Sequence, residues 1–557
     1  MSRFVDKMID TARTGGAHRG VTTGEPTAPV HTTWAQIHEQ ATVVAGALRT
    51  RGLAPHDAVA VLAAEPAAIG PAVQAVWLCG GSVTMLHQPT PRSDLGLWAQ
   101  DTVAVLNMIG AKLVLLGAPF DQLAPVLDEH GINYQLLTGL DDAAPLTEFV
   151  DVDEDAPALL QLTSGSTAEP KAVRITHGNL HANISAMARM AALDPESDTM
   201  VSWLPMFHDM GMVGFYTTPM VMGIELVKVT PVDFLTGPLL WADLISRYRA
   251  TITAAPNFAY AVLGRRLSTV DSGADYDLSP LRLALNGAEP IDEKAVRAFT
   301  DAGARFGMRA ECVFPAYGMA EGTLAISFAP LLTGLRLDYV EADPLESDDR
   351  AVPVEDPDER EPGTVRSFAL LGEPLPGFDV EIVDAAGNAR GEREVGEIRI
   401  RGASVTPGYL TVNGPLATQD ERGWLNTGDI GYLVAGEVVI CGRAKDVIIL
   451  AGRNIYPTDV ERAACTVEGV RAGNAVAVRL DAGTRRERFA VVAESKLAGD
   501  EDAARRLRKE IGARVFEAVN ARPSAVLILS PGTLPKTPSG KLRRAAAATQ
   551  LADSLDT

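Results

Sequence analysis

The segment at residues 158–171, which reads ALLQLTSGSTAEPK, constrains the fold more than any other part of the chain. Its apolar first half predicts a buried strand, and its second half predicts a loop of small and hydroxyl residues. Small residues let backbone N–H groups approach an anion closely, and hydroxyl groups add further donors. With the charge of Lys171 and a helix expected from about Gly178, the segment predicts a phosphate cradle.

This cradle is not a Walker A loop, because the pattern Gly-x-x-x-x-Gly-Lys-[Ser/Thr] is absent. A polar surface turn is the alternative interpretation of the same residues. Other segments of the chain are therefore needed to decide between the two.

Length and charge exclude several classes of function. A chain of 557 residues is long enough for two or more domains. The formal net charge of -21 argues against a nucleic-acid partner and against a general attraction to anionic membranes. No secretory signal and no long apolar run is evident, so we expect a cytoplasmic protein without an integral membrane segment. The cysteines lack metal-ligand spacing and are expected to be reduced.

The order of helical and strand-like segments predicts the fold class. A helical pattern at 34–51 alternates with short apolar runs at 58–64 and 113–116, which favours a mainly parallel α/β sheet. The apolar stretch at 63–86 is interpreted as a buried helix and strand. The acidic stretch at 341–362 is expected to be an exposed loop or an insertion.

A second structural unit is expected after Arg443. A strand at 447–450, a turn and a helix from Thr458 follow one another there. The sequence Thr-Asp-Val-Glu at the start of that helix has the pattern of a capping box. The last hundred or so residues are therefore expected to form a small α+β domain.

Six further segments carry the chemistry when they are taken together. Each is weak alone, but their order and spacing resemble the core motifs of the adenylate-forming superfamily, which includes acyl-CoA synthetases, luciferases and peptide-synthetase adenylation domains. The segments are SWLPMFHDMGM at 202–212, NGAEP at 286–290, YGMAE at 317–321, TGD at 427–429, GRAKD at 442–446 and PKTPSGK at 535–541.

A closer resemblance is to the fatty acyl-AMP ligases. The segments at 202–212 and 286–290, with APNFAY at 255–260, are similar to that branch. The long spacing between Glu321 and the LGEP segment at 371–374 resembles the insertion that the branch carries. The resemblance implies an α/β fold with an α+β part. Its large N-terminal domain of packed α/β subdomains spans 1–444, and a small mobile domain that carries the catalytic lysine spans 445–557.

The resemblance implies that ATP activates a medium- or long-chain fatty acid as its acyl-adenylate and that pyrophosphate is released. Both reactants are anionic, so the enzyme must mainly neutralise and orient them. Lys541 matches the catalytic lysine, although a basic tail on an acidic protein is the plainer interpretation. Glu321 matches the catalytic glutamate that binds Mg²⁺, and a helix-start glutamate is the alternative.

The nucleotide-binding residues are also implied by the resemblance. Asp429 would accept from the ribose hydroxyls, where a plain turn aspartate is the alternative, and Arg443 would contact ribose or phosphate. Tyr317 would stack on adenine. The other cofactor-binding residues are Thr163, Ser164, Gly165, Ser166, Thr167 and Lys171 for the phosphates, and Asn286, Gly287, Ala288, Glu289 and Gly318 around adenine.

At the acyl end, His208 matches a site residue beside the acyl group and the thiol gate. We favour a lining role for it over acid–base work. Lys445 matches the hinge of the family. The acyl pocket is expected to be apolar, although a plain core would give the same pattern. Its expected lining residues are Trp203, Met206, Phe207, Met210, Met212, Phe215 and Phe258.

The acceptor of the acyl group stays open. The leading hypothesis is the phosphopantetheine thiol of a separate acyl carrier protein or polyketide synthase. Lys171 departs from many fatty acyl-AMP ligases and is present in the CoA ligases, so a long-chain acyl-CoA synthetase that uses CoA is the alternative. A non-catalytic protein that binds nucleotide or acyl groups on the same fold is the third possibility.

Overall fold

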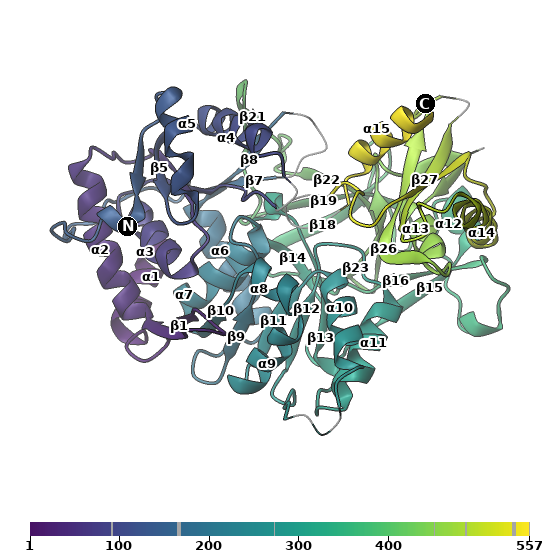
Figure 1. The fold of residues 1–557 in the computed structure, drawn as a ribbon, viewed down its shortest axis with the longest axis horizontal. Coiled ribbons are helices and arrows are strands. Elements are labelled where there is room, and N and C mark those ends of the chain that lie inside the picture. Colours follow the sequence, from purple (N-terminus) through teal and green to yellow (C-terminus); the bar gives the residue numbers. More distant parts are fainter. Residues whose placement is uncertain are drawn as a thin grey trace.

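The computed structural model describes residues 1–90, 93–163, 169–271, 273, 275–450, 452–484, 487–536 and 542–555. Two large sheets with helices on their faces form most of the molecule, and a smaller sheet with its own helices lies at the C-terminal end (Figure 1). The expected α/β fold with an α+β part is confirmed. In the ranges given, no helix is both long enough and apolar enough to cross a membrane.

The first large sheet is built around short apolar strands. In order, its strands are β21 (Gly414–Ala417), β20 (Gly408–Thr411), β8 (Lys171–Thr176), β7 (Pro157–Leu162), β4 (Ser82–Met85), β3 (Ala58–Leu62), β5 (Ala111–Leu116) and β6 (Tyr134–Leu136). β3 is paired in parallel with β4 and β5, as the apolar runs predict. β7 joins in parallel beside β4, whereas β8 and β20 pair antiparallel.

The second large sheet positions most of the site. In order, its strands are β17 (Glu373–Pro374), β14 (Ala325–Phe328), β13 (Val313–Gly318), β12 (Leu283–Asn286), β11 (Ile252–Ala255), β9 (Thr199–Ser202), β10 (Glu225–Lys228), β1 (Gly20–Thr23) and β2 (Val30–Thr33). The block from β13 to β10 is parallel. Its carboxyl ends therefore meet at one edge, where ligand sites of such sheets lie.

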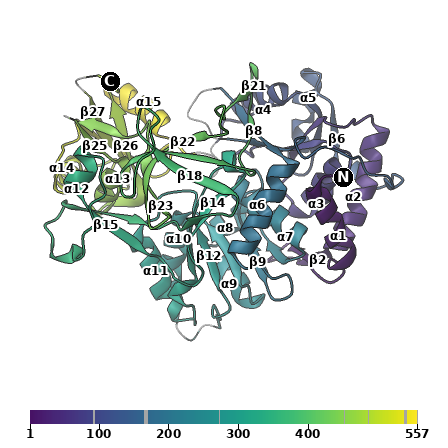
Figure 2. The same cartoon turned by 180° about the vertical axis from the view of Figure 1, so that it is seen from behind.

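Helices cover the faces of both sheets. They are α1 (Arg3–Thr14), α2 (Trp34–Thr50), α3 (Pro66–Leu78), α4 (Leu95–Ile109), α5 (Ala124–Glu129), α6 (His177–Met190), α7 (Thr218–Met222), α8 (Pro231–Thr236), α9 (Leu239–Arg247), α10 (Asn257–Leu267) and α11 (Glu293–Ala304). The next helix, α12 (Ala342–Ser347), packs instead against the strands at 337–341 and 453–455. α6 begins with a capping box of Thr176 and Asn179. It packs against β7 and β8 in one sheet and β14 in the other, so it lies between them (Figure 2).

The rest of the chain is richer in antiparallel strands. β15 (Leu337–Glu341) pairs with β16 (Val365–Ala369). Another sheet has the order β18 (Phe378–Val383), β19 (Gly396–Gly402), β22 (Leu425–Val434) and β23 (Glu437–Arg443). The C-terminal part contains β24 (Ile448–Leu450), β25 (Arg453–Ile455), α13 (Pro457–Cys465), β26 (Val470–Leu480), β27 (Arg488–Ser495), α14 (Glu501–Val519), β28 (Ala525–Leu529) and α15 (Arg544–Leu555).

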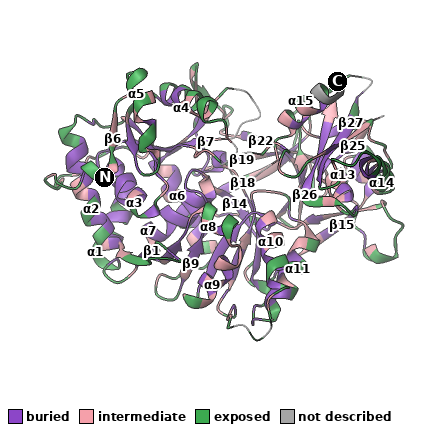
Figure 3. Cartoon of the chain, viewed as in Figure 1, coloured by how far each residue is buried: buried purple, intermediate pink, exposed green. Residues whose placement is uncertain are grey.

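Buried side chains form separate clusters in the two parts of the chain. Figure 3 marks the buried residues along the ribbon. One further cluster is shared between the two parts. It combines Val340, Leu345 and Phe368 with Val447 and Tyr456, which follow β23. The predicted boundary at 444/445 therefore lies next to a shared apolar contact, and the division into domains stays a prediction.

The helix expected from about Gly178 is confirmed as α6, which begins at His177. Between the loop after β7 and this helix lies the strand β8, which pairs antiparallel with β7. The role of the loop as a phosphate cradle stays a prediction. One local expectation was wrong: the capping box at Thr458 does not form, because α13 begins with Pro457 and its N-cap, Tyr456, makes no side-chain cap.

The stretch at 341–362 is only partly an exposed loop. It begins with the end of β15 and with α12, in which Leu345 and Glu346 are buried. Leu345 packs into the shared cluster, and Glu346 forms ion pairs with Arg366 and with Arg453 of the C-terminal part, both at 2.5 Å. Apolar contacts of Leu345 and ion pairs of Glu346 therefore hold the first half of the stretch against the rest of the protein.

Candidate active site

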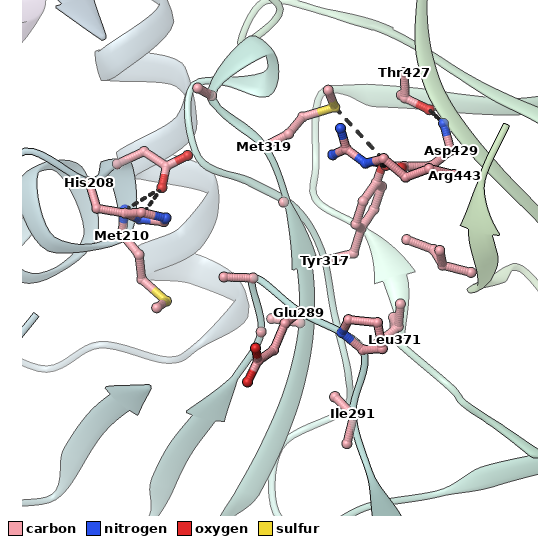
Figure 4. Close-up of a pocket in the computed structure, with 18 of the residues that line it drawn as sticks. His208, Met210, Glu289, Ile291, Tyr317, Met319, Leu371, Thr427, Asp429 and Arg443 are labelled. Carbon is pink, nitrogen blue, oxygen red and sulfur yellow. Dashed lines mark hydrogen bonds and ion pairs between the residues drawn. The ribbon is translucent and has the colours of Figure 1, made fainter. Parts of the chain in front are cut away.

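A cavity of about 1180 Å³ lies where the two large sheets meet the C-terminal part (Figure 4). Its walls come from the carboxyl ends of β12 and β13, from β22 and β23, and from α13, β26 and α15. The predicted site residues that line it are Thr163, Lys171, Phe207, His208, Met210, Phe215, Gly287, Ala288, Glu289, Tyr317, Gly318, Glu321, Asp429, Arg443 and Lys445.

Five predicted residues lie outside the described residues. They are Ser164, Gly165, Ser166, Thr167 and Lys541. The chain next to Lys541 is described, and Leu542, Arg543 and Arg544 line the cavity. Arg544 is fixed there by ion pairs with Asp446 at 3.2 Å and Glu461 at 2.9 Å. The roles of the predicted residues stay predictions.

Asp429 is the centre of a polar cluster at one end of the cavity. The Tyr317 hydroxyl donates to its Oδ2 at 2.7 Å, and Arg443 Nε lies 3.0 Å from its Oδ1 (Figure 4). Asp429 and Arg443 are register partners on β22 and β23, so strand pairing sets this geometry. Burial raises the pKa of Asp429, and the charge of Arg443 opposes that shift.

The segment after β12 forms the neighbouring wall. Glu289 accepts a hydrogen bond from the backbone N–H of Phe258 at 2.5 Å. Asn286 is not among the residues that line the cavity, and its expected place beside adenine stays a prediction. Leu285 and Gly287 face the cavity, and successive strand residues point to opposite faces, so Asn286 is buried and bonds Asn257 at 3.1 Å.

Lys171 and Glu321 meet at a residue that the sequence analysis missed. The Lys171 Nζ lies 3.9 Å from the centroid of the Tyr409 ring, and the Tyr409 hydroxyl donates to Glu321 Oε1. Tyr409 is the second residue of β20 and follows the sequence Thr-Pro-Gly at 406–408, and nothing in that local sequence indicates a site. It reaches the cavity because β20 pairs with β8.

The site fits a Mg²⁺ ion that is held mainly by phosphate and water. Among the described residues, no group of three or more His, Cys, Asp or Glu side chains is placed to hold a metal. Mg²⁺ in nucleotide sites commonly takes one or two carboxylates and the phosphates of the substrate. Glu321 is a buried carboxylate on the cavity wall, so it matches that need.

Two histidines line the cavity near the end of β9. His208 Nδ1 lies 2.7 Å from Asp209 Oδ1 (Figure 4). His87, which the sequence analysis missed, packs edge-on against Phe207 with ring centroids 5.3 Å apart. Burial, with a smaller effect of His208, lowers the pKa of His87 to about 4. Its position just after β4, at the carboxyl end of a parallel strand, is a signal that could have identified it.

An apolar arm of the cavity runs along the second sheet beside α6. Its walls include Leu283 and Leu285 of β12 and Gly287, which follows the end of that strand. Further lining residues are Met187, Ala191, Leu193, Met200, Ile252, Phe314, Leu324, Ala325 and Phe328. Beyond its far end, Arg282 donates to the Ala191 carbonyl at 3.0 Å.

Four of the expected acyl-pocket residues do not line the cavity. Trp203 stacks on Phe234 with ring centroids 4.1 Å apart and belongs to an aromatic core cluster with Trp241. The other three are Met206, Met212 and Phe258. Sequence alone cannot separate these residues from those of the cavity wall, because buried apolar residues look the same whether they line a cavity or a core.

Lys445 lies where the chain leaves β23 for the C-terminal part. Its carbonyl accepts a hydrogen bond from Arg479 at 3.3 Å. Burial lowers the pKa of its ammonium, the charge of Asp446 opposes this, and Arg443 and Lys171 add to the lowering. The hinge role of Lys445 stays a prediction.

The chain is similar to known proteins along most of its length. The AMP-binding enzyme family matches residues 13–410 of the chain. A Mycobacterium tuberculosis protein named as a ligase is 52% identical over 98% of this chain and 99% of its own. A Caulobacter vibrioides protein named as an acyl-CoA synthetase is 35% identical over 93% and 89%. The medium-chain-fatty-acid–[acyl-carrier-protein] ligase JamA of Moorena producens is 34% identical over 71% and 68%.

Solved structures agree with the family match. A structure from a study of fatty acyl-adenylate ligases of E. coli and L. pneumophila is 28% identical with a TM-score of 0.88. It covers 100% of this chain and 99% of that chain. The chain therefore belongs to the AMP-binding enzyme family and is an adenylate-forming ligase.

Proposed function

We propose that this protein activates a fatty acid with ATP as its acyl-adenylate and releases pyrophosphate. The observation that carries the proposal is the continuity of one cavity from a polar end to an apolar arm. Lys171, Asp429 and Arg443 supply charge at the polar end. An acyl-adenylate has matching parts, because a charged nucleotide is joined to an apolar chain.

The polar end serves a reaction between two anions, in which the carboxylate attacks the α-phosphorus of ATP and pyrophosphate leaves. Lys171 and the loop from Thr163 to Thr167 bind the β- and γ-phosphates. Lys541 bridges the carboxylate and the α-phosphate and stabilises charge in the transition state. When bound at Glu321, Mg²⁺ neutralises charge on the phosphates.

The nucleoside lies between β13 and the pair β22–β23. Asp429 offers two oxygens to the ribose diol, and Arg443 contacts ribose or phosphate. Tyr317 and the segment at 287–289 enclose the adenine. The Tyr317–Asp429 hydrogen bond supports this assignment, because it holds the aromatic ring for adenine beside the carboxylate for the ribose hydroxyls.

The acyl chain lies in the apolar arm beside α6. From Gly287 to Leu283 the strand advances by four residues, which is about 13 Å of extended backbone. An arm of that length suits a medium- or long-chain acid better than a short one. JamA, a relative named for medium-chain fatty acids, supports the same substrate class.

The acceptor is the phosphopantetheine thiol of a separate acyl carrier protein or polyketide synthase. JamA is named as an [acyl-carrier-protein] ligase. The stretch at 341–362 also contacts the C-terminal part. Glu346 pairs with Arg453, and Asn454 donates to Asp349 at 3.1 Å, so these contacts must break in any rotation of that part.

CoA is the second candidate acceptor. Lys171 matches the CoA ligases, and one relative is named as an acyl-CoA synthetase. In either case Lys445 is the hinge, and rotation about it exchanges the adenylating and transferring arrangements.

The test incubates the purified protein with ATP, Mg²⁺ and acids of several chain lengths, with and without CoA or a phosphopantetheinylated carrier protein. Mass spectrometry resolves the products. Acyl-AMP that persists with CoA but loads the carrier protein is the expected result. Acyl-CoA would identify CoA as the acceptor. No adenylate with any acid would contradict the proposal and favour a non-catalytic binding protein.

A further inference from the structure

Tyr409 contacts both charged groups that bind the phosphates and the metal in the proposed function. Its ring faces the Lys171 ammonium at 3.9 Å, and its hydroxyl donates to Glu321 Oε1. The side-chain contacts that the structure describes for Lys171 and Glu321 are thus with Tyr409 and not with each other. One residue separates a cation from an anion on the same cavity wall.

Strand register fixes Tyr409 in this position. On the β20–β8 pair, Tyr409 lies opposite Val173, and Thr411 lies opposite Lys171. Tyr409 is partly buried, and its hydroxyl lies within hydrogen-bond reach of the Glu321 carboxylate. A carboxylate can only accept, so the hydroxyl is the donor in this contact.

We propose that Tyr409 is a positioning residue that prevents a direct ion pair between Lys171 and Glu321 and so keeps both available to ATP and a divalent cation. The proposal rests on the proposed function of the site. Opposite charges attract more strongly in a desolvated cavity than in water, and a direct pair would neutralise both groups. An aromatic face holds an ammonium without neutralising it. The hydroxyl occupies one Glu321 oxygen and leaves the other for a metal.

The two contacts can be separated by substitution. Tyr409→Phe keeps the ring for Lys171 and removes the donor to Glu321. Loss of a hydrogen-bond partner of a metal-ligating group typically weakens metal binding about 10–100-fold. We therefore expect weaker divalent-cation binding in Tyr409→Phe and unchanged nucleotide binding without the cation. Tyr409→Leu removes both contacts and should weaken both.

A matched control is available on the surface of the first sheet. The Tyr134 hydroxyl donates to the Asp128 carboxylate at 3.4 Å in an exposed environment. Tyr134 does not line the cavity. Tyr134→Phe therefore removes the same kind of hydrogen bond and should leave cation and nucleotide binding unchanged.

The experiment measures Mn²⁺ binding by EPR in the presence of a non-hydrolysable ATP analogue, and analogue binding in EDTA by calorimetry. Tyr409→Phe is expected to bind Mn²⁺ about 10-fold more weakly and the analogue normally. Mn²⁺ affinity equal to that of the wild type would overturn the role of the hydroxyl. Normal analogue binding by Tyr409→Leu would overturn the role of the ring.

The wild-type protein separates the two proposals. If the wild type binds the analogue and Mn²⁺ while the variants behave as the wild type, only the role of Tyr409 is wrong. If the wild type binds neither, the proposed function of the site fails and the role of Tyr409 fails with it. Thermal unfolding of each variant shows that the comparison is between folded proteins.

Discussion

Asp429 on β22 lies opposite Arg443 on β23, and the two side chains form an ion pair with Nε and Oδ1 3.0 Å apart. The same carboxylate accepts from Tyr317 through its other oxygen. Three residues that are far apart in sequence are therefore coupled at the proposed nucleoside end of the cavity.

Asp429→Asn is expected to weaken ATP binding by about 10-fold or more, because a charged acceptor is lost while an oxygen remains for the Tyr317 hydroxyl. Calorimetric titration with ATP measures the change. Asp379→Asn is the control, since Asp379 pairs with Arg401 on the surface at 2.7 Å. Equal ATP affinity in the two variants would remove Asp429 from nucleotide binding.

Ala191→Leu is expected to shift the preferred acid to a shorter chain. Ala191 lines the far end of the apolar arm, and a larger side chain there fills space that the end of a long acid needs. Rates of adenylate formation across chain lengths check this. Ala188→Leu, near the end of α6 but outside the lining, should keep the wild-type profile. A uniform loss across all acids would contradict the assigned position of the chain.

His87 should make the protein less stable as the pH falls. Its folded-state pKa is lowered from 6.5 to about 4, so between these values the unfolded chain binds a proton that the folded chain does not. The free energy of unfolding therefore decreases as the pH drops through this window, by about 2 kcal/mol between about pH 7 and pH 5 for this residue.

Chemical unfolding at a series of pH values measures this contribution. His87→Gln should show a shallower loss of stability with decreasing pH than the wild type. His130→Gln changes an exposed histidine and serves as the control. Parallel curves for the wild type and His87→Gln would show that burial of His87 does not contribute.

Lys445→Pro is expected to retain adenylation and to lose transfer of the acyl group. Proline restricts the backbone at the proposed hinge, while no described backbone hydrogen bond uses the Lys445 N–H. Separate assays of acyl-AMP formation and of acyl transfer give the answer. Equal loss of both half-reactions would contradict the hinge role, because it would show that Lys445 is needed for folding or for the chemical step itself.

Lys541→Ala is expected to lower adenylate formation by about 10²–10³-fold, which is typical for loss of one preorganised donor. ATP binding should be retained, because the phosphates and the nucleoside have other partners. Single-turnover formation of acyl-AMP and ATP titration measure the two quantities. Wild-type adenylation in this variant would exclude Lys541 from the mechanism.

The sequence predicted those parts of the fold and site whose signals are local. The apolar runs at 58–64 and 113–116 became β3 and β5 because a buried parallel strand needs little more than a short apolar segment. Glu289, Tyr317 and Asp429 were assigned from short motifs, and the structure brings them to one cavity.

What could not be predicted depends on pairing between distant segments. Tyr409 reaches the site only because β20 pairs with β8, and the local sequence carries no trace of that pairing. Trp203 looked like a pocket residue, but whether an apolar side chain meets a cavity or Phe234 is decided by packing. Asn286 is not part of the cavity wall, because the face to which a strand residue points depends on its exact register.

The apolar cluster shared by Phe368 and Tyr456 gives the proposed hinge motion a thermal signature. A rotation about Lys445 that parts these side chains would expose apolar surface to water. Such exposure carries a positive heat-capacity change, so the enthalpy of the conformational step would depend on temperature. A van 't Hoff plot of the equilibrium constant between the adenylating and transferring arrangements should then be curved and not straight.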